Sequence, residues 1–153
     1  MEIWLIRHGK AEERIDDLTD GQRRLVAKGE AQAAKIARYL EKIAKGKKLQ
    51  FWSSPLVRAQ ETVKILMTPF GGIPRVQGEI SEGDLLPLLN LWGKSGADVQ
   101  VVVGHEPFLS EWLEDMTGIR QEFSTGSMAR IQVAHLIPPK GKLLEYVEPE
   151  KLE

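Results

Sequence analysis

The stretch Val99-Gln100-Val101-Val102-Val103-Gly104-His105 decides the fold class of this chain. Four of its first five residues are valine. Such a β-branched run is typical of a strand covered on both faces, as in a parallel sheet between helices. The run stops at Gly104-His105, and a helical pattern then extends to about Met116. A buried strand that leads directly into a helix predicts an α/β architecture.

Short apolar runs and helical patterns alternate through the rest of the chain. We expect strands at 3–6, 49–52 and 76–80, helices at 28–45, 56–67 and 85–92, and two adjacent strands at 128–136 and 143–147. The connection Pro138-Pro139-Lys140-Gly141 predicts a hairpin between the last two strands. The prediction is therefore a three-layer α/β sandwich with a mostly parallel, mixed central sheet flanked by helices. No repeat or linker divides the chain, so residues 1–153 are expected to form a single domain.

Two helix starts are predicted from the local sequence. Ser54 can cap the helix at 56–67, with Pro55 in its first position. Asp84 can cap the helix at 85–92 in the same way.

Composition and charge exclude several classes of protein. Of the 153 residues, 42% are hydrophobic and 28% are charged, which is the balance of a soluble globular chain. The 21 Lys and Arg offset 22 Asp and Glu to leave a net charge of −1, so no strong field is available to hold nucleic acid or an anionic membrane. The absence of cysteine excludes disulfides, thiolate metal sites and cysteine nucleophiles. The apolar start is too short for a signal peptide or a membrane span, and we expect a cytoplasmic protein.

Polar clusters follow three of the predicted strands. Arg7-His8-Gly9 follows the first, Ser53 to Arg58 follows the second, and Gly104-His105 follows the valine-rich strand. Because the carboxyl ends of parallel strands line one crevice, we expect two histidines and two arginines to converge there. Guanidiniums suit phosphate oxygens, and a neutral imidazole can attack phosphorus. The prediction is a phosphate pocket with a histidine nucleophile.

Each of these signals has a simpler interpretation when taken alone. A single histidine after a strand is more often a hydrogen-bonded loop residue, and an arginine on a first helical turn usually serves solvent or a carboxylate. The placement of all three polar clusters at strand ends favours the interpretation as a phosphate pocket. His135 has no partner motif and is expected to be structural. Three histidines without cysteine make a dedicated metal site improbable, and none is expected.

Three motifs in order resemble those of a known family. Leu5-Ile6-Arg7-His8-Gly9-Lys10-Ala11-Glu12 resembles the R-H-G signature of the histidine phosphatase superfamily, which has the phosphoglycerate mutase-like fold. Ser53-Ser54-Pro55-Leu56-Val57-Arg58-Ala59-Gln60-Glu61-Thr62 is similar to its second motif, S-P-x-x-R-A-x-x-T. Val101-Val102-Val103-Gly104-His105-Glu106-Pro107 resembles the third, a strand that ends in G-H.

Within this superfamily the chain most resembles the compact SixA-type phosphohistidine phosphatases. Arg23-Arg24-Leu25-Val26-Ala27-Lys28-Gly29 is similar to the R-x-L-T-x-x-G of that branch, although Val26 stands where threonine is usual. The segment Phe123-Ser124-Thr125-Gly126-Ser127, which leads into a strand, is a further similarity.

The resemblance implies a role for each matching residue. His8 would be the nucleophile that becomes phosphorylated, and Arg7, Arg58 and His105 would surround the phosphate. Arg23 would be a further anion contact from its loop. The family needs no metal and no organic cofactor, so we expect neither.

The general acid is not singled out by any motif. The mutase and acid-phosphatase branches protonate an alkoxide leaving group with a carboxyl group. Glu79, Glu82 and Asp84 lie in the relevant region here, although at least two of them are expected to serve surface solubility. The usual acid is absent from the SixA-like branch. That absence is tolerable when the bond broken is P–N, because the imidazole of phosphohistidine leaves more easily than an alkoxide.

The sequence thus predicts a metal-independent phosphohydrolase that works through a phosphohistidine intermediate. Its expected substrate is phosphohistidine on a signalling or phosphocarrier protein. One alternative is a phosphatase for a small phosphate ester, with Glu82 or another carboxyl group as the acid. A second alternative is a non-catalytic module that binds phosphate or a phosphoprotein.

Overall fold

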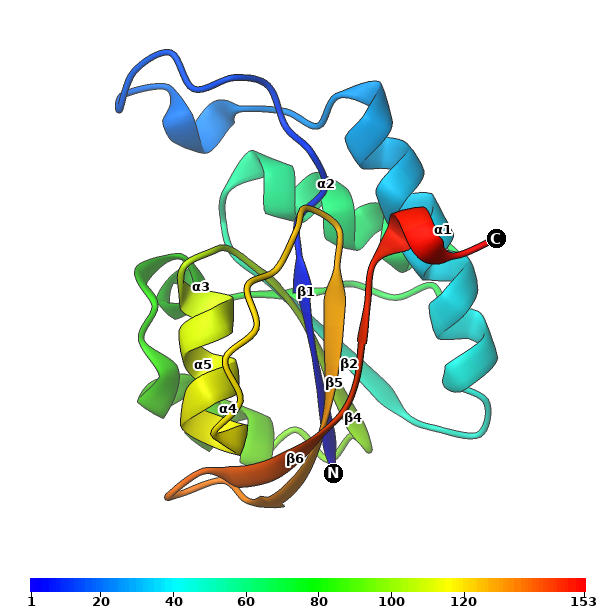
Figure 1. Cartoon of the computed structure of the whole chain (residues 1–153), viewed down its shortest axis with the longest axis vertical. Coiled ribbons are helices and arrows are strands. Elements are labelled where there is room, and N and C mark those ends of the chain that lie inside the picture. Colours follow the sequence, from blue (N-terminus) through cyan, green and yellow to red (C-terminus); the bar gives the residue numbers. More distant parts are fainter.

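A six-stranded sheet organises the computed structural model, which describes residues 1–153 (Figure 1). The strands are β1 (Glu2–Arg7), β2 (Leu49–Ser53), β3 (Arg75–Val76), β4 (Val99–Gly104), β5 (Met128–His135) and β6 (Lys140–Val147). They lie in the order β3-β2-β4-β1-β5-β6. The first four in this order are parallel, and β5 is antiparallel to both of its neighbours. The predicted mixed, mostly parallel sheet is confirmed.

Helices cover both faces of this sheet (Figure 1). On one face lie α1 (Ala27–Ile43) and α2 (Val57–Leu66). On the other lie α3 (Gly78–Glu82), α4 (Leu85–Gly93) and α5 (Phe108–Thr117). Two short 3-10 helices complete the structure, η1 (Asp20–Gln22) and η2 (Pro149–Lys151). The three-layer α/β sandwich is therefore confirmed, and none of its helices has the length and apolar character needed to cross a membrane.

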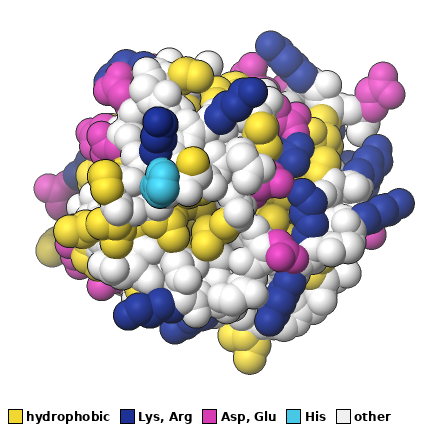
Figure 2. All heavy atoms as spheres, turned by 90° about the horizontal axis from the view of Figure 1, so that it is seen from below, with side chains coloured by type: hydrophobic (Ala, Val, Ile, Leu, Met, Phe, Trp, Pro, Cys, Tyr) yellow, Lys and Arg dark blue, Asp and Glu magenta, His cyan; other side chains and the backbone are white.

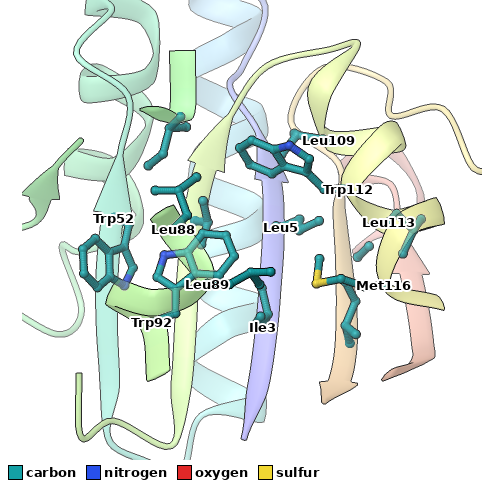
Figure 3. Close-up of a cluster of buried hydrophobic side chains, with 14 of the residues drawn as sticks. Ile3, Leu5, Trp52, Leu88, Leu89, Trp92, Leu109, Trp112, Leu113 and Met116 are labelled. Carbon is teal, nitrogen blue, oxygen red and sulfur yellow. The ribbon is translucent and has the colours of Figure 1, made fainter. Parts of the chain in front are cut away.

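Alternate residues of the central strands supply two separate cores. Ile3 and Leu5 of β1 belong to one cluster, whereas Trp4 and Ile6 belong to the other, as the two-residue period of a strand requires. Figure 3 shows the first cluster, where tryptophans and leucines fill the space between the sheet and helices α4 and α5. All four tryptophans are at most 2% exposed, as expected for core residues. Truncating one of them to alanine would cost roughly 3–5 kcal/mol of stability.

The predicted strand at 76–80 is wrong beyond Val76. β3 ends at that residue, and Ile80 lies in α3, fully buried over Gly104. Two apolar residues four positions apart fit one helical turn as well as they fit a strand. Gly83, with a φ of 76°, then ends the turn in the left-handed region that glycine adopts readily.

Two other local predictions need correction. α2 begins at Val57 after Leu56 and has no side-chain cap, so Ser54 does not serve that role and Pro55 lies before the helix. Asp84 does flank α4, but its carboxylate makes no capping hydrogen bond. In the last hairpin β6 begins at Lys140, so the connecting turn is shorter than predicted.

The carboxyl ends of β1, β2 and β4 meet at one edge of the sheet. Arg7 pairs with Gly104, and Ser53 pairs with Val103. The loop between β1 and α1 lies over this edge, at the top of Figure 1. The opposite end of the molecule carries Lys and Arg interspersed with Asp, Glu and apolar side chains (Figure 2). The predicted polar clusters therefore lie together, beneath a single loop.

Candidate active site

Three of the predicted site residues meet where β1, β4 and α2 converge. His8 follows β1, and its backbone N–H donates to the carbonyl of Gly104 at the end of β4. The ring centroids of His8 and His105 lie 5.2 Å apart. Arg58, in the first turn of α2, donates from Nε to Nε2 of His8 over 3.3 Å. All three side chains belong to residues that are 6–7% exposed, so they form a buried cationic and imidazole cluster.

The two neighbours of His8 define its tautomer. Nδ1 lies 2.7 Å from the carbonyl oxygen of Gly9, and because a carbonyl only accepts, Nδ1 must carry the proton. Nε2 then keeps its lone pair, to which Arg58 donates. Burial is the main cause that lowers the pKa of His8 to about 4; the nearby guanidiniums act in the same direction, and the hydrogen bond with the Gly9 carbonyl opposes them. At neutral pH the ring is therefore uncharged, with a nucleophilic nitrogen at Nε2.

His105 is held by a serine hydroxyl. Its Nε2 lies 2.6 Å from Oγ of Ser54, which is fully buried and also accepts from the N–H of Leu56. Burial lowers the pKa of His105 to about 3, with His8 and Arg58 contributing in the same direction. Nδ1 of His105 is buried without a protein partner. A polar atom of this kind is available to a ligand.

Arg7 is anchored by the segment between α5 and β5. Its backbone N–H donates to the carbonyl of Ser127, and its guanidinium donates to the carbonyl of Phe123 over 2.7 Å. The N–H of Gly126 donates to the carbonyl of His8 over 3.0 Å. The Nε atom of Arg7 remains buried without a partner. The segment 123–127 thus supports both His8 and a guanidinium that adds to the positive potential around it.

A second set of contacts positions the turn after His8. The N–H of Gly9 donates to Oγ1 of Thr62 over 3.0 Å, and the Thr62 hydroxyl donates to the carbonyl of Arg58 over 2.8 Å. Thr62 therefore joins the His8 turn to the helix that carries Arg58. The backbone of Gly9 lies against Gly29, and a Cβ on Gly9 would lie 2.5 Å from the Gly29 carbonyl oxygen. Glycine is required at this close approach.

Arg23 lies at the edge of this cluster. Its Nε donates to Oδ1 of Asp20 over 2.9 Å, and a terminal nitrogen donates to the carbonyl of Glu12. After burial, which is the largest cause, the charge of Arg23 contributes to the lowered pKa of His8 and of Arg58. The loop therefore brings a third guanidinium to the pocket.

The comparison with protein families agrees with this geometry. The family model of the histidine phosphatase superfamily (branch 1) matches residues 3–87. The chain belongs to the histidine phosphatase superfamily. A relative from Picosynechococcus sp., described only as an uncharacterized protein, is 38% identical over 122 residues, which cover 74% of this chain and 72% of the relative.

Solved structures of phosphatases share the fold. The protein histidine phosphatase SixA complexed with tungstate aligns over 100% of both chains, with a TM-score of 0.84 and 20% identity. A putative α-ribazole-5′-P phosphatase from Escherichia coli covers 97% of this chain and 98% of its own, with a TM-score of 0.75 and 18% identity. The superfamily and the SixA-like fold, both expected from the motifs, are confirmed.

In this histidine phosphatase the carboxylate that contacts the guanidiniums of the pocket is Asp20, which none of the sequence motifs predicts. Glu79, Glu82 and Asp84 make no hydrogen bond or ion pair with Arg7, His8, Arg58 or His105. Asp20 contacts both Arg58 and Arg23 instead. Its spacing of three residues before Arg23 could indicate the pair with Arg23, since such residues are neighbours on a helical turn, but not the contact with Arg58, 38 positions away.

The surface hollow along α2 lies apart from the cluster of Arg7, His8, Arg58 and His105. No group of three or more His, Asp or Glu side chains is arranged to hold a metal ion. A surface hollow of about 560 Å³ runs along α2 and includes Val57, Lys64 and Met67 in its lining, but none of the four predicted catalytic residues. The candidate site is therefore singled out by its chemistry rather than by the volume of a cavity.

Proposed function

We propose that this phosphatase removes phosphate from phosphohistidine on a protein and works through a phosphohistidine formed on His8. The proposal rests first on the buried, neutral ring of His8. Nδ1 is occupied by the Gly9 carbonyl, and Nε2 keeps its lone pair beside Arg58. A nucleophile among fixed cations is what transfer of an anionic phosphoryl group requires.

The reaction proceeds in two displacements. In the first, Nε2 of His8 attacks phosphorus in line, and the bond from phosphorus to the substrate nitrogen breaks. The substrate imidazole departs neutral when its other ring nitrogen carries a proton. In the second, water attacks phosphorus and the electron pair of the P–N bond returns to Nε2. The proton of water leaves with inorganic phosphate, while Arg7, Arg58 and His105 stabilise the transferring group in both steps.

Two features support a protein as the substrate: exposed aliphatic side chains on the loop over the pocket, and the lack of an acid beside His8 and Arg58. Ile15 and Leu18 are 88% and 93% exposed, on the same loop whose Asp20 contacts Arg58. A macromolecular partner can bury exposed aliphatic groups beside a reaction site, whereas a small ester is too small to cover them. No carboxyl group in proton-donating form contacts His8 or Arg58, which suits a leaving group that needs no acid.

A small phosphate ester is the alternative substrate. The likeness to a putative α-ribazole-5′-P phosphatase favours it, because the same fold there is described as acting on a small molecule. In that case Glu79, Glu82 or Asp84 would have to approach the pocket to protonate an alkoxide.

The decisive experiment measures phosphate release in EDTA from two substrates side by side. One is a protein phosphorylated on histidine, and the other is p-nitrophenyl phosphate. We expect faster release from the phosphohistidine protein and loss of both activities in His8→Ala. His135→Ala, which changes an exposed histidine at the far end of β5, is the matched control and should retain activity.

The other outcomes reassign the function. A preference for p-nitrophenyl phosphate would favour the small-ester phosphatase. Binding of phosphate without turnover or phosphoenzyme formation would favour a non-catalytic module. Wild-type turnover in a folded His8→Ala protein would remove His8 from the nucleophile role.

A further inference from the structure

Asp20 lies where the guanidiniums of the pocket meet. Its Oδ1 accepts from Nε of Arg23 over 2.9 Å, and its Oδ2 lies 3.4 Å from a terminal nitrogen of Arg58. Nε of Arg14 is 3.7 Å from Oδ1. A carboxylate that is 24% exposed thus pairs with three guanidiniums, two of which belong to the predicted phosphate-binding set.

Arg58 is bound to Asp20 in two separable ways. The backbone carbonyl of Asp20 accepts from one terminal nitrogen over 2.9 Å, and the side chain meets the other. The backbone contact orients the guanidinium whichever side chain stands at position 20. The side-chain contact uses the N–H group that a phosphoryl oxygen would need for a two-point contact with Arg58.

The carboxylate of Asp20 acts as an anion and not as an acid. Burial opposes its ionisation, but Arg58, Arg23 and Arg14 together hold the pKa of Asp20 below its usual value. A group that is ionised at neutral pH has no proton to donate to a leaving group. It does have the charge and the geometry to compete with a phosphoryl group for the same donors.

We propose that Asp20 is an internal competitor for the phosphate site, whose carboxylate occupies Arg58 and Arg23 until a phosphoryl group displaces it. The inference rests on the proposed function only in taking the incoming anion to be a phosphoryl group. Apparent affinity for an anion falls by the fraction of molecules in which the site is free. Free phosphate makes contacts only within this site. A phosphoryl group on a protein also has the contacts that the protein makes outside the site, and these help it to displace the carboxylate. Asp20 therefore promotes release of inorganic phosphate and favours large substrates.

The test is calorimetric titration of inorganic phosphate into the 153-residue protein, its Asp20→Asn and Asp20→Ala variants, and Asp17→Asn. Asp17 lies on the same loop, its side chain is 86% exposed, and it pairs only with Arg14, so it controls for the loss of one negative charge. We expect phosphate to bind on the order of tenfold more tightly to both Asp20 variants, and with wild-type affinity to Asp17→Asn. Unchanged or weaker binding to the Asp20 variants would overturn the proposal, as would the absence of phosphate binding in all four proteins.

A second measurement separates displacement from a general change in electrostatic field. In ¹⁵N-labelled wild-type protein, phosphate should move the amide signals of Asp20 and Gly21, because the carboxylate leaves Arg58. The shifts should be smaller in Asp20→Ala. Static loop signals in a wild-type protein that binds phosphate would contradict displacement. Both readouts measure binding, so they can succeed or fail independently of the phosphohistidine assay.

Discussion

Nε of Arg58 donates a hydrogen bond to Nε2 of His8 over 3.3 Å. The lone pair proposed to attack phosphorus is therefore already oriented by a cation suited to the phosphoryl oxygens. A proton on Nε2 would face this donor, so the contact and the burial of the ring both favour the neutral imidazole. One guanidinium thus favours the neutral form of His8 and is placed to bind the phosphoryl group that His8 is proposed to attack.

Arg58→Ala should lower kcat/KM by about 10²-fold or more, the loss typical of removing one donor to a developing charge. Arg58→Lys should recover only part of this loss, because an ammonium cannot contact His8 and a phosphoryl oxygen with the fork geometry of a guanidinium. Steady-state kinetics on the preferred substrate measure both effects. Lys64→Ala removes one exposed cation from the same helix and should leave the rate unchanged. A loss of only twofold in Arg58→Ala would place Arg58 outside the reaction.

Stability should rise with pH between about pH 4 and 6.5. In the unfolded chain a histidine takes up its proton near pH 6.5. In the folded protein, burial lowers the pKa of His8 to about 4 and that of His105 to about 3. The unfolded state therefore binds more protons in this window, so the free energy of unfolding falls as the pH decreases. Each histidine should contribute on the order of 1 kcal/mol per pH unit.

Urea unfolding at pH 5, 6 and 7.5 measures this slope. His105→Gln removes one of the two groups and should give a shallower dependence on pH. His135→Gln, which changes an exposed histidine, is the matched control and should keep the wild-type slope. Parallel slopes for all three proteins would show that the buried histidines do not couple protonation to folding.

The sheet and the position of the site could be predicted because both depend on short-range patterns. The valine run of β4 has the composition of a doubly covered strand, and each polar motif directly follows its strand in the chain. Parallel pairing then brings Arg7 beside Gly104. The helix around Ile80 was not predicted, because its burial depends on packing over Gly104 in a distant strand.

The roles of Asp20 and Ser54 could not be predicted from local sequence. Asp20 contacts Arg58 across 38 positions, and Ser54 contacts His105 across 51. A serine before proline has the local pattern of a helix cap, so the pattern alone favoured the wrong partner. The roles of Asp20 and Ser54 both depend on tertiary contacts, which are formed only in the folded chain.

Ser54 should control the tautomer of His105. Oγ accepts from the N–H of Leu56 and lies 2.6 Å from Nε2 of His105. If the hydroxyl donates to Nε2, Nδ1 carries the proton and can donate to a phosphoryl oxygen. Ser54→Ala should therefore lower kcat by roughly 10-fold or more, and ¹⁵N spectra should show a changed distribution of the ring proton of His105.

Ser53→Ala is the control for this prediction. Ser53 is equally buried, but its hydroxyl donates to the carbonyl of Ser54 and does not contact His105. Its spectrum for the His105 ring should match that of the wild type. A Ser54→Ala protein with lower activity but an unaltered His105 tautomer would limit Ser54 to a packing role.

Gly9→Ala should damage both folding and catalysis. The added Cβ would lie 2.5 Å from the carbonyl oxygen of Gly29, a backbone atom that cannot rotate away. The turn would have to move, at a cost of about 1–3 kcal/mol typical of overpacking. Because the N–H of Gly9 also donates to Thr62, that movement should displace His8 from Arg58.

Gly78→Ala is the control, since a Cβ there would meet only the flexible carboxylate of Glu82, at 3.6 Å. Urea unfolding together with kcat/KM distinguishes the outcomes: a Gly9→Ala protein with wild-type stability and activity would mean that the close approach of these two turns does not hold His8 in place.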